Sequence, residues 1–182
     1  MPPAERRREP KILIIYHDTD LQVRNLVNRM SNIMNSRNCS VIISTTQNLL
    51  QQDLNNADAI VFGTPTYMGS PSVEFKQFMD NTGMLINHQI LNNKLAAGFT
   101  YGNLSSSSGG SKHACLQTLV NFAAQHCMVW APLGYCPNSV NRTHVDLGLA
   151  VQSEDWPNYM NDDFQLAGQF ANNIVDAVNR WV

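Results

Sequence analysis

The segment from Ala57 to Gly83 constrains the fold most, because a buried-strand pattern, a loop and a helical pattern follow one another directly. The apolar run from Ala59 to Phe62 has the length and the β-branched content of a buried strand. Gly63 and Pro65 interrupt this run and open a loop. The segment therefore predicts a strand that leads through a short loop into a helix.

The helix after this loop has clear end signals. Ser70 is a suitable N-cap, and Pro71 suits the first helical turn, where its missing N–H group costs nothing. Gly83 can end the helix. The apolar positions between them recur at helical spacing, at Val73, Phe75, Phe78 and Met79. In an open α/β sheet, ligands bind at such a strand-to-helix loop, although a purely structural connection is the alternative interpretation.

The rest of the chain repeats this alternation of strand and helix. Further strands are predicted over 11–16, 40–44, 95–100 and 128–133. Helices are predicted over 23–34, 112–125 and 164–178, with a weak one over 49–54. Residues 134–161 show no clean period and predict a long loop with a short helical piece near 147–151. Five strands alternating with helices predict an α/β fold, a doubly wound parallel sheet with helices on both faces.

Domain organisation and compartment follow from the ends and the composition of the chain. Residues 1–10, MPPAERRREP, predict a disordered basic tail, or alternatively a short docking or targeting arm, before one domain over 11–182. A net charge of -2 gives no electrostatic basis for binding nucleic acid, and no apolar run is long enough for a membrane span. The four cysteines form no CxxC pair and predict no metal site. We expect an intracellular, reducing compartment, cytoplasmic by default.

Four stretches carry a resemblance to a known family. They read GTPTYMGSP (63–71), LAAGFTYGN (95–103), GGSKHACLQTLV (109–120) and HCMVWAPLGY (126–135). Together they resemble flavodoxin-like NAD(P)H:quinone oxidoreductases of the tryptophan-repressor-binding-protein type and the related NADPH-dependent FMN reductases. The resemblance covers most of the chain from Lys11 onward. It implies a flavodoxin-like sheet with strand order 2-1-3-4-5, and assembly into dimers or tetramers, which is common among such proteins.

Three loops are expected at the carboxyl ends of the central strands, namely His17 to Asp20, Gly63 to Ser70, and Tyr101 to Ser111. The resemblance implies that the first loop cradles the FMN phosphate and that the other two border the isoalloxazine ring. It implies flavin contacts at Pro65, Thr66, Tyr67, Met68, Gly69, Thr100, Tyr101, Gly102 and Asn103. His17, at the end of the first strand, is a further candidate to reach the crevice.

The first loop departs from the family pattern. Flavodoxin-like proteins typically carry Ser/Thr-x-Thr-Gly-x-Thr here, because hydroxyl groups and free N–H groups at a helix N-terminus favour an anion. This chain instead has a degenerate phosphate loop, Asp18, Thr19, Asp20 and Leu21. Each carboxylate roughly 5 Å from a phosphate would cost about 3 kcal/mol at an effective dielectric constant near 20. Alternatively, Asp18 or Asp20 serves as the helix N-cap and takes the place of the anion.

Two functional hypotheses follow, and the sequence leaves open whether the chain is an enzyme. The first is an FMN-binding oxidoreductase of the NAD(P)H:quinone reductase type, in which flavin N5 accepts hydride from NAD(P)H and the electrons pass to a quinone. The second is a non-catalytic flavodoxin-fold subunit that has lost FMN and acts as a structural or interaction component of a larger assembly. The ring loop favours the first hypothesis, and the altered phosphate loop favours the second.

Overall fold

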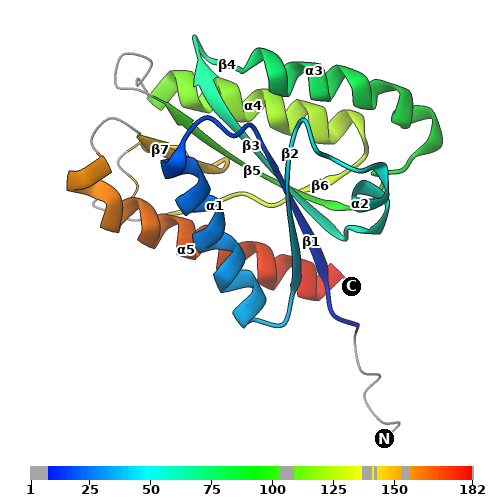
Figure 1. The fold of residues 1–182 in the computed structure, drawn as a ribbon, viewed down its shortest axis with the longest axis horizontal. Helices are drawn as coiled ribbons and strands as arrows, with labels where there is room; N and C mark the ends of the chain where they lie inside the picture. Colours follow the sequence, from blue (N-terminus) through cyan, green and yellow to red (C-terminus); the bar gives the residue numbers. More distant parts are fainter. Residues whose placement is uncertain (1–7, 103–108, 137–140, 142, 153–155, 182) are drawn as a thin grey trace, which may run out of the picture.

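A twisted parallel sheet with helices on both faces forms the core of the computed structural model, which describes residues 8–102, 109–136, 141, 143–152 and 156–181 (Figure 1). The strand order is β2-β1-β3-β5-β6, and all of these neighbours pair in parallel. The strands are β1 (Lys11–Tyr16), β2 (Ser40–Thr45), β3 (Ala59–Tyr67), β5 (Leu95–Gly102) and β6 (Val129–Trp130). The predicted order 2-1-3-4-5 is therefore confirmed, because β4 is a short hairpin strand outside this path.

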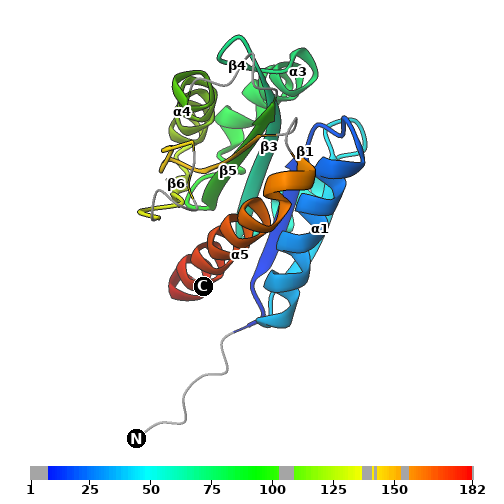
Figure 2. The ribbon, with the colours of Figure 1, turned by 90° about the vertical axis from the view of Figure 1, so that its left-hand side faces the viewer.

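The helices divide between the two faces of the sheet (Figure 2). α1 (Leu21–Ser36) and α5 (Trp156–Trp181) pack on one face, where they cover Ile12 and Ile14. α2 (Gln51–Asn56), α3 (Val73–Thr82) and α4 (Gly109–Gln125) pack on the other face, over Leu13 and Ile15. Successive side chains of a strand point to opposite faces. The continuous apolar run of β1 therefore fills both cores, as a buried parallel strand requires.

β3 is longer than the sequence predicts. Gly63 and Pro65 do not end it, and the strand continues to Tyr67. Pairing with β1 stops at Gly63, whereas pairing with β5 continues to Pro65 opposite Tyr101. The main-chain N of Pro65 points to the same side as that of Gly63, toward β1. Because β1 has ended there, the missing N–H group of Pro65 breaks no ladder bond.

The start of α3 differs from the prediction as a result. The prediction that Ser70 caps this helix is wrong, since Ser70–Pro71 form β4, which pairs antiparallel with the end of β3. Ser72 is the N-cap, and its hydroxyl accepts from the N–H group of Phe75 at 3.2 Å. Gly83 caps the carboxyl end of α3 as predicted, and the 3₁₀ helix η1 (Gly83–His88) follows.

The outermost position beside β5 is shared by two short strands. β6 pairs with the start of β5, and β7 (Leu149–Gln152) pairs with Phe99 to Gly102 near its end. The predicted helical piece near 147–151 is therefore wrong, and the predicted strand over 128–133 shrinks to two residues. Residues 149–151 form a strand and not a helix because they pair with β5, and in this position Leu149, Ala150 and Val151 are all buried. The close approach of β7 requires glycine at position 148, where a Cβ would collide with the carbonyl oxygen of Gly98.

Part of the predicted tail is attached to the domain. The Arg8 guanidinium donates to both oxygens of Asp58, at 2.8 and 2.5 Å, and the Lys11 amide donates to the same carboxylate at 2.9 Å. Burial raises the pKa of Asp58, but these hydrogen bonds outweigh it, so the pKa lies below its ordinary value. The preceding residues 1–7 lie outside the described part of the chain.

We expect Gly63→Ala to lower the free energy of unfolding by about 2–3 kcal/mol, because its Cβ would overlap the buried ring of Phe99. The clash should shrink in a Phe99→Leu background, so the two changes together should cost less than their sum. Urea unfolding measures all three variants. Gly83→Ala is the matched control, because its Cβ meets no atom within 4 Å and its cost should be near zero. Strict additivity would refute the predicted clash.

We also expect Asp58→Asn to lower the free energy of unfolding by about 1–3 kcal/mol at pH 7, because it weakens charge-assisted hydrogen bonds. A carboxyl whose pKa is lowered by folding stabilises the fold above its unfolded pKa of about 3.9, and this contribution is lost as the pH falls through the folded pKa. The gap between the two proteins should therefore close below about pH 4. Asp80→Asn serves as control, because Asp80 forms only an exposed pair with Lys76. A gap that persists in acid would contradict the assignment.

Candidate functional site

Three segments meet at the carboxyl end of the central strands. The N–H group of His17, just after β1, donates to the carbonyl oxygen of Gly63 in β3 at 2.9 Å. Pro65 pairs with Tyr101 of β5, and the Tyr101 hydroxyl donates to the carbonyl oxygen of His17. The sequence predicts that the loops after these strands lie at one edge of the sheet. In the structure, Gly63 to Pro65 pair with Phe99 to Tyr101. Asn103, the last predicted contact, lies outside the described residues.

Tyr101 stabilises this site through buried contacts. Its side chain is buried, and its ring stacks on Phe99 with centroids 6.3 Å apart. Its hydroxyl also lies 3.5 Å from Thr19 Oγ1. Burial raises the pKa of Tyr101, and the nearby charges of Asp20 and Asp18 act in the same direction. The phenol therefore stays protonated and holds the loop after β1 against β5.

Thr66 and Thr100 are also turned into the protein. Their hydroxyl oxygens lie 2.5 Å apart, and Thr100 Oγ1 donates to the carbonyl oxygen of Thr64 at 2.7 Å. Both side chains are buried, and Cys115 lies behind them with its Sγ 3.7 Å from Thr100 Oγ1. Burial raises the pKa of the Cys115 thiol, which keeps it protonated. The side chains of these predicted contact residues thus hold β3 to β5 inside the protein.

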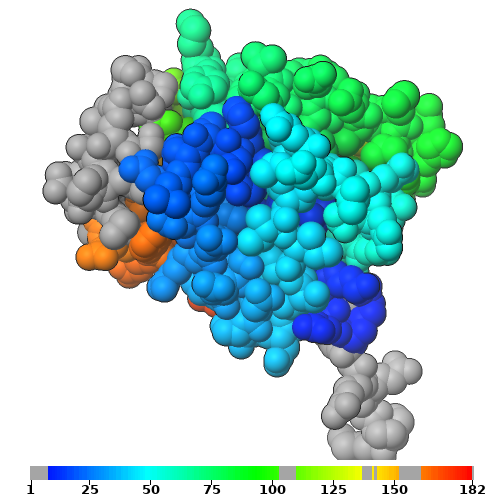
Figure 3. Space-filling model, in the orientation of Figure 1, coloured from blue at the N-terminus to red at the C-terminus, as the bar shows by residue number. Residues whose placement is uncertain are grey.

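The β3–β4 hairpin presents the exposed part of the site. Tyr67 pairs with Ser70, so Met68 and Gly69 form the two-residue turn. Both turn residues have positive φ, 49° and 82°, which defines a type I′ turn. The Met68 side chain is 98% exposed and Tyr67 is 57% exposed. The hairpin projects beyond the sheet at the top of Figures 1 and 3.

Two more apolar side chains lie exposed at this end of the sheet, each on the first residue of a helix. Leu21 of α1 is 67% exposed and Val73 of α3 is 81% exposed. Val73 shares the helical spacing of Phe75, Phe78 and Met79, but it is the first residue of α3 and lies exposed, whereas those three are buried. Tyr67, Met68, Leu21 and Val73 are thus four exposed apolar side chains at the carboxyl end of the sheet. The sequence does contain a sign that Val73 is exposed, because it directly follows Ser72, a residue type that commonly caps helices.

The loop after β1 is organised around its two carboxylates. Asp20 is the N-cap of α1, and its Oδ1 accepts from the N–H groups of Gln22 and Val23 at 2.8 and 3.0 Å. Its Oδ2 accepts from Thr19 Oγ1 at 3.0 Å. Both oxygens of Asp18 accept from Arg24 Nε, at 2.9 and 2.8 Å. The helix N-terminus therefore already holds an anion, which is the protein's own side chain.

His17 links this loop to α3. Its Nδ1 lies 2.9 Å from Ser72 Oγ and 3.8 Å from Glu74 Oε2. Ser72 in turn accepts from the start of α3, and its N–H group donates to Thr64 Oγ1 at 3.1 Å. These contacts join the loop after β1 to the start of α3.

The two halves of the site fit FMN differently. At the end expected to bind the isoalloxazine ring, the exposed side chains of Tyr67 and Met68 offer an aromatic ring and a thioether, which suit a flat and partly apolar ligand. At the phosphate end, the N–H groups of Gln22 and Val23, which would bind the anion, already donate to the Asp20 carboxylate. The residues present therefore fit the isoalloxazine ring and do not fit the phosphate group.

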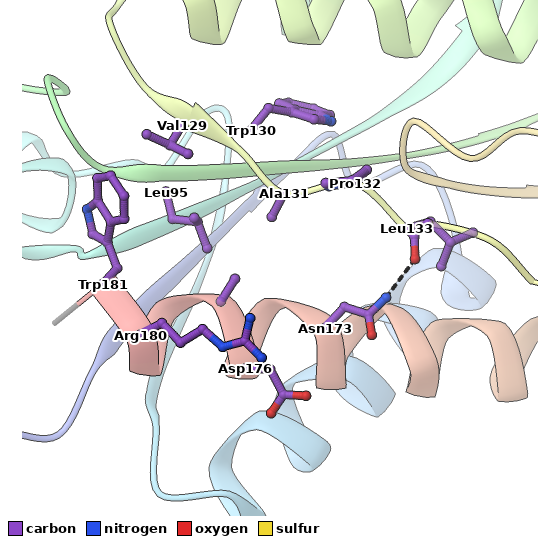
Figure 4. A pocket seen from close by; sticks show the side chains of 12 residues that line it. Leu95, Val129, Trp130, Ala131, Pro132, Leu133, Asn173, Asp176, Arg180 and Trp181 are labelled. Atoms are coloured by element: carbon purple, nitrogen blue, oxygen red, sulfur yellow. Dashed lines mark hydrogen bonds between the residues drawn. The ribbon is translucent and has the colours of Figure 1, made fainter.

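One hollow of the described structure lies away from the predicted flavin contacts. A cavity of about 540 Å³ opens between β6 and the last turns of α5, and Leu95 at the start of β5 lines it (Figure 4). Asn173 closes one side by donating to the carbonyl oxygen of Leu133 at 2.6 Å. None of the predicted flavin contacts lines it. Within the described residues, no group of His, Cys, Asp and Glu side chains could hold a metal ion, and no helix has the length and apolar character to cross a membrane.

Comparison with known proteins identifies the relatives of this chain. Residues 17–135 match the model of the family described as NADPH-dependent FMN reductase. The flavodoxin FldP of Pseudomonas aeruginosa (strain UCBPP-PA14) is 34% identical over 108 residues, which make up 55% of this chain and 57% of that protein. The chain thus matches little more than half the length of this relative.

Solved structures extend the likeness to nearly the whole chain. A flavodoxin, WrbA-like protein from Agrobacterium tumefaciens superposes with a TM-score of 0.76 at 26% identity, covering 96% of this chain and 100% of that one. A Fusobacterium nucleatum flavodoxin bound to flavin mononucleotide gives a TM-score of 0.69 at 14% identity, covering 92% and 98% of the two chains. At 14% identity, the similarity to the Fusobacterium nucleatum flavodoxin shows a shared fold alone.

We expect Met68→Asn to raise the free energy of unfolding by about 0.5–1 kcal/mol. Asn tolerates positive φ better than Met, and Asn-Gly is the preferred type I′ turn. Gly69→Ala should act in the opposite direction, by about 1 kcal/mol, because alanine is strained at a φ of 82°. Urea unfolding of the two variants tests the turn. A loss of stability in Met68→Asn would show that the methionine packs on the protein.

Proposed function

This chain belongs to the NADPH-dependent FMN reductase family, and on this basis we propose that it is a flavin-dependent oxidoreductase of the NAD(P)H:quinone reductase type. A bound flavin would supply the redox chemistry, accepting hydride at N5 from NAD(P)H and delivering electrons to a quinone-like acceptor. The residues of this chain would place the ring and keep water from one of its faces.

The observation that carries the proposal is the strained, exposed tip of the β3–β4 hairpin. A methionine with positive φ costs the fold about 1 kcal/mol or more, and its full exposure returns no packing energy. Such strain is characteristic of binding sites, where a ligand uses the conformation. The tip stands at the carboxyl end of the sheet, where open α/β folds bind ligands. Together with Tyr67, it offers an apolar surface that matches a flat aromatic ring.

Buried residues near this tip support the same function, because they hold the strand ends around it in fixed positions. Thr66 and Thr100 fix the end of β3 to β5, while Tyr101 fixes the loop after β1. A ligand that binds over these strand ends would meet main-chain groups whose positions are set before binding. Such preorganisation lowers the entropy cost of binding. The chain's contribution to the reaction would therefore be placement rather than acid–base catalysis.

A second function is favoured by one specific contact. Asp20 occupies the N–H groups that bind the FMN phosphate in flavodoxin-like proteins, which suits a non-catalytic subunit that no longer carries FMN. Such a subunit would act as a structural or interaction component of a larger assembly. Under either function we propose an oligomer, as the family resemblance implies. The cysteines at 39, 115, 127 and 136 are free thiols, which suits the proposed cytoplasmic location.

We expect purified protein to quench flavin fluorescence on titration and to oxidise NADH or NADPH when a quinone is supplied. Replacing Tyr67 and Met68 together with alanine should weaken flavin binding at least tenfold, or about 1.4 kcal/mol, and reduce the turnover in parallel. Met84→Ala is the matched control, because Met84 is 77% exposed on η1 and lies outside the site. Absence of both flavin binding and nicotinamide oxidation would refute the proposal and leave the non-catalytic subunit.

A further inference from the structure

We propose that the flavin site selects a flavin without a phosphate group, one whose ribityl chain ends in a hydroxyl, as in riboflavin. This inference rests on the proposed function, because it assumes that Tyr67 and Met68 of the hairpin bind the isoalloxazine ring. It concerns the other end of the ligand, at the loop after β1. The structural basis is that the protein supplies its own anion where a phosphate would bind.

The first step of the argument is the occupied helix N-terminus. A phosphate at such a position binds the free N–H groups of the first turn. In α1, Asp20 Oδ1 already accepts from two of them, on Gln22 and Val23. The first helical residue is Leu21, whose large exposed side chain stands where the family pattern has glycine. A phosphate would therefore have to displace a bound carboxylate and approach past a leucine.

The second step is the charge around this position. FMN carries a phosphate with a charge near −2 at neutral pH. Arg24, near the start of α1, is already paired, because its Nε donates to both oxygens of Asp18 at 2.9 and 2.8 Å. Among the described residues, Asp20 has no ion-pair partner. The phosphate would be repelled by a carboxylate without an ion-pair partner, whereas a neutral chain end would not be repelled.

The third step is that the same groups suit a hydroxyl. Asp20 Oδ2 already accepts a hydrogen bond from an alcohol, Thr19 Oγ1, at 3.0 Å. An ionised carboxylate has lone pairs for further donors. Thr19 lies 3.5 Å from the Tyr101 hydroxyl, so this acceptor adjoins the segment that borders the ring. A terminal ribityl hydroxyl would thus find a charged acceptor, and hydrogen bonds to charged groups are the stronger ones.

The test compares riboflavin and FMN by fluorescence-quenching titration at neutral pH and low salt. We expect the natural protein to bind riboflavin at least about tenfold more tightly than FMN. Asp20→Ser keeps a helix-capping side chain and removes the charge. It should tighten FMN binding about a hundredfold and weaken riboflavin binding about tenfold, because the charged acceptor for the terminal hydroxyl is lost. Added salt should reduce the preference in the natural protein by screening the carboxylate.

Asp80→Ser is the matched control, because it removes the same charge near the end of α3 remote from β4. Circular dichroism checks that each variant is folded, and Asp20→Asn replaces Asp20→Ser if the serine variant fails this check. FMN binding more tightly than riboflavin in the natural protein would overturn the inference and leave the proposed function intact. An equal gain for FMN in the Asp80 control would overturn it too. If neither flavin binds, the proposed function itself fails.

Discussion

The pairing of β3 with β5 is the interaction on which the rest of the structure depends. It runs from Ala59 opposite Leu95 to Pro65 opposite Tyr101, and so continues beyond the end of β1. This overhang carries the β3–β4 hairpin past the edge of the sheet and fixes its direction. It also places Tyr101 where its hydroxyl reaches the main chain after β1. The exposed hairpin is thus a consequence of the β3–β5 pair being longer than the β1–β3 pair.

The sequence predicted most of the fold because its central strands are continuous apolar runs. Such runs suit only strands that are buried on both faces, and the helices between them leave parallel pairing as the simple solution. Prediction failed where tertiary pairing outweighed local signals. Pro65 reads as a strand breaker, but the absence of a neighbour on one side makes it harmless in β3. The run at 149–151 is too short to show its period, and only its burial against β5 makes it a strand.

The candidate site was predicted unevenly for a similar reason. Asp20 was readable as an N-cap because its role is local and depends on the next few residues. The exposure of Met68 was not readable, because a type I′ turn is usually signalled by Asn-Gly and not by Met-Gly. Thr66 and Thr100 were identified as site residues by resemblance, yet their hydroxyl groups bond to each other inside the protein. Whether a side chain at the end of a strand points into the protein or toward solvent depends on the pairing register. That register is set by two strands together and cannot be read from one segment.

The division of the outermost strand into β6 and β7 also affects how the molecule meets its own copies. An edge strand with unpaired main-chain groups can template the addition of another chain, and short or interrupted edges suppress this. On the β5 side, the edge consists of pieces of two and four residues. The opposite edge is β2, an uninterrupted strand of six residues with Ile42 and Ile43 exposed. The risk of edge-to-edge aggregation is therefore concentrated on β2, while the divided edge protects the other side of the sheet.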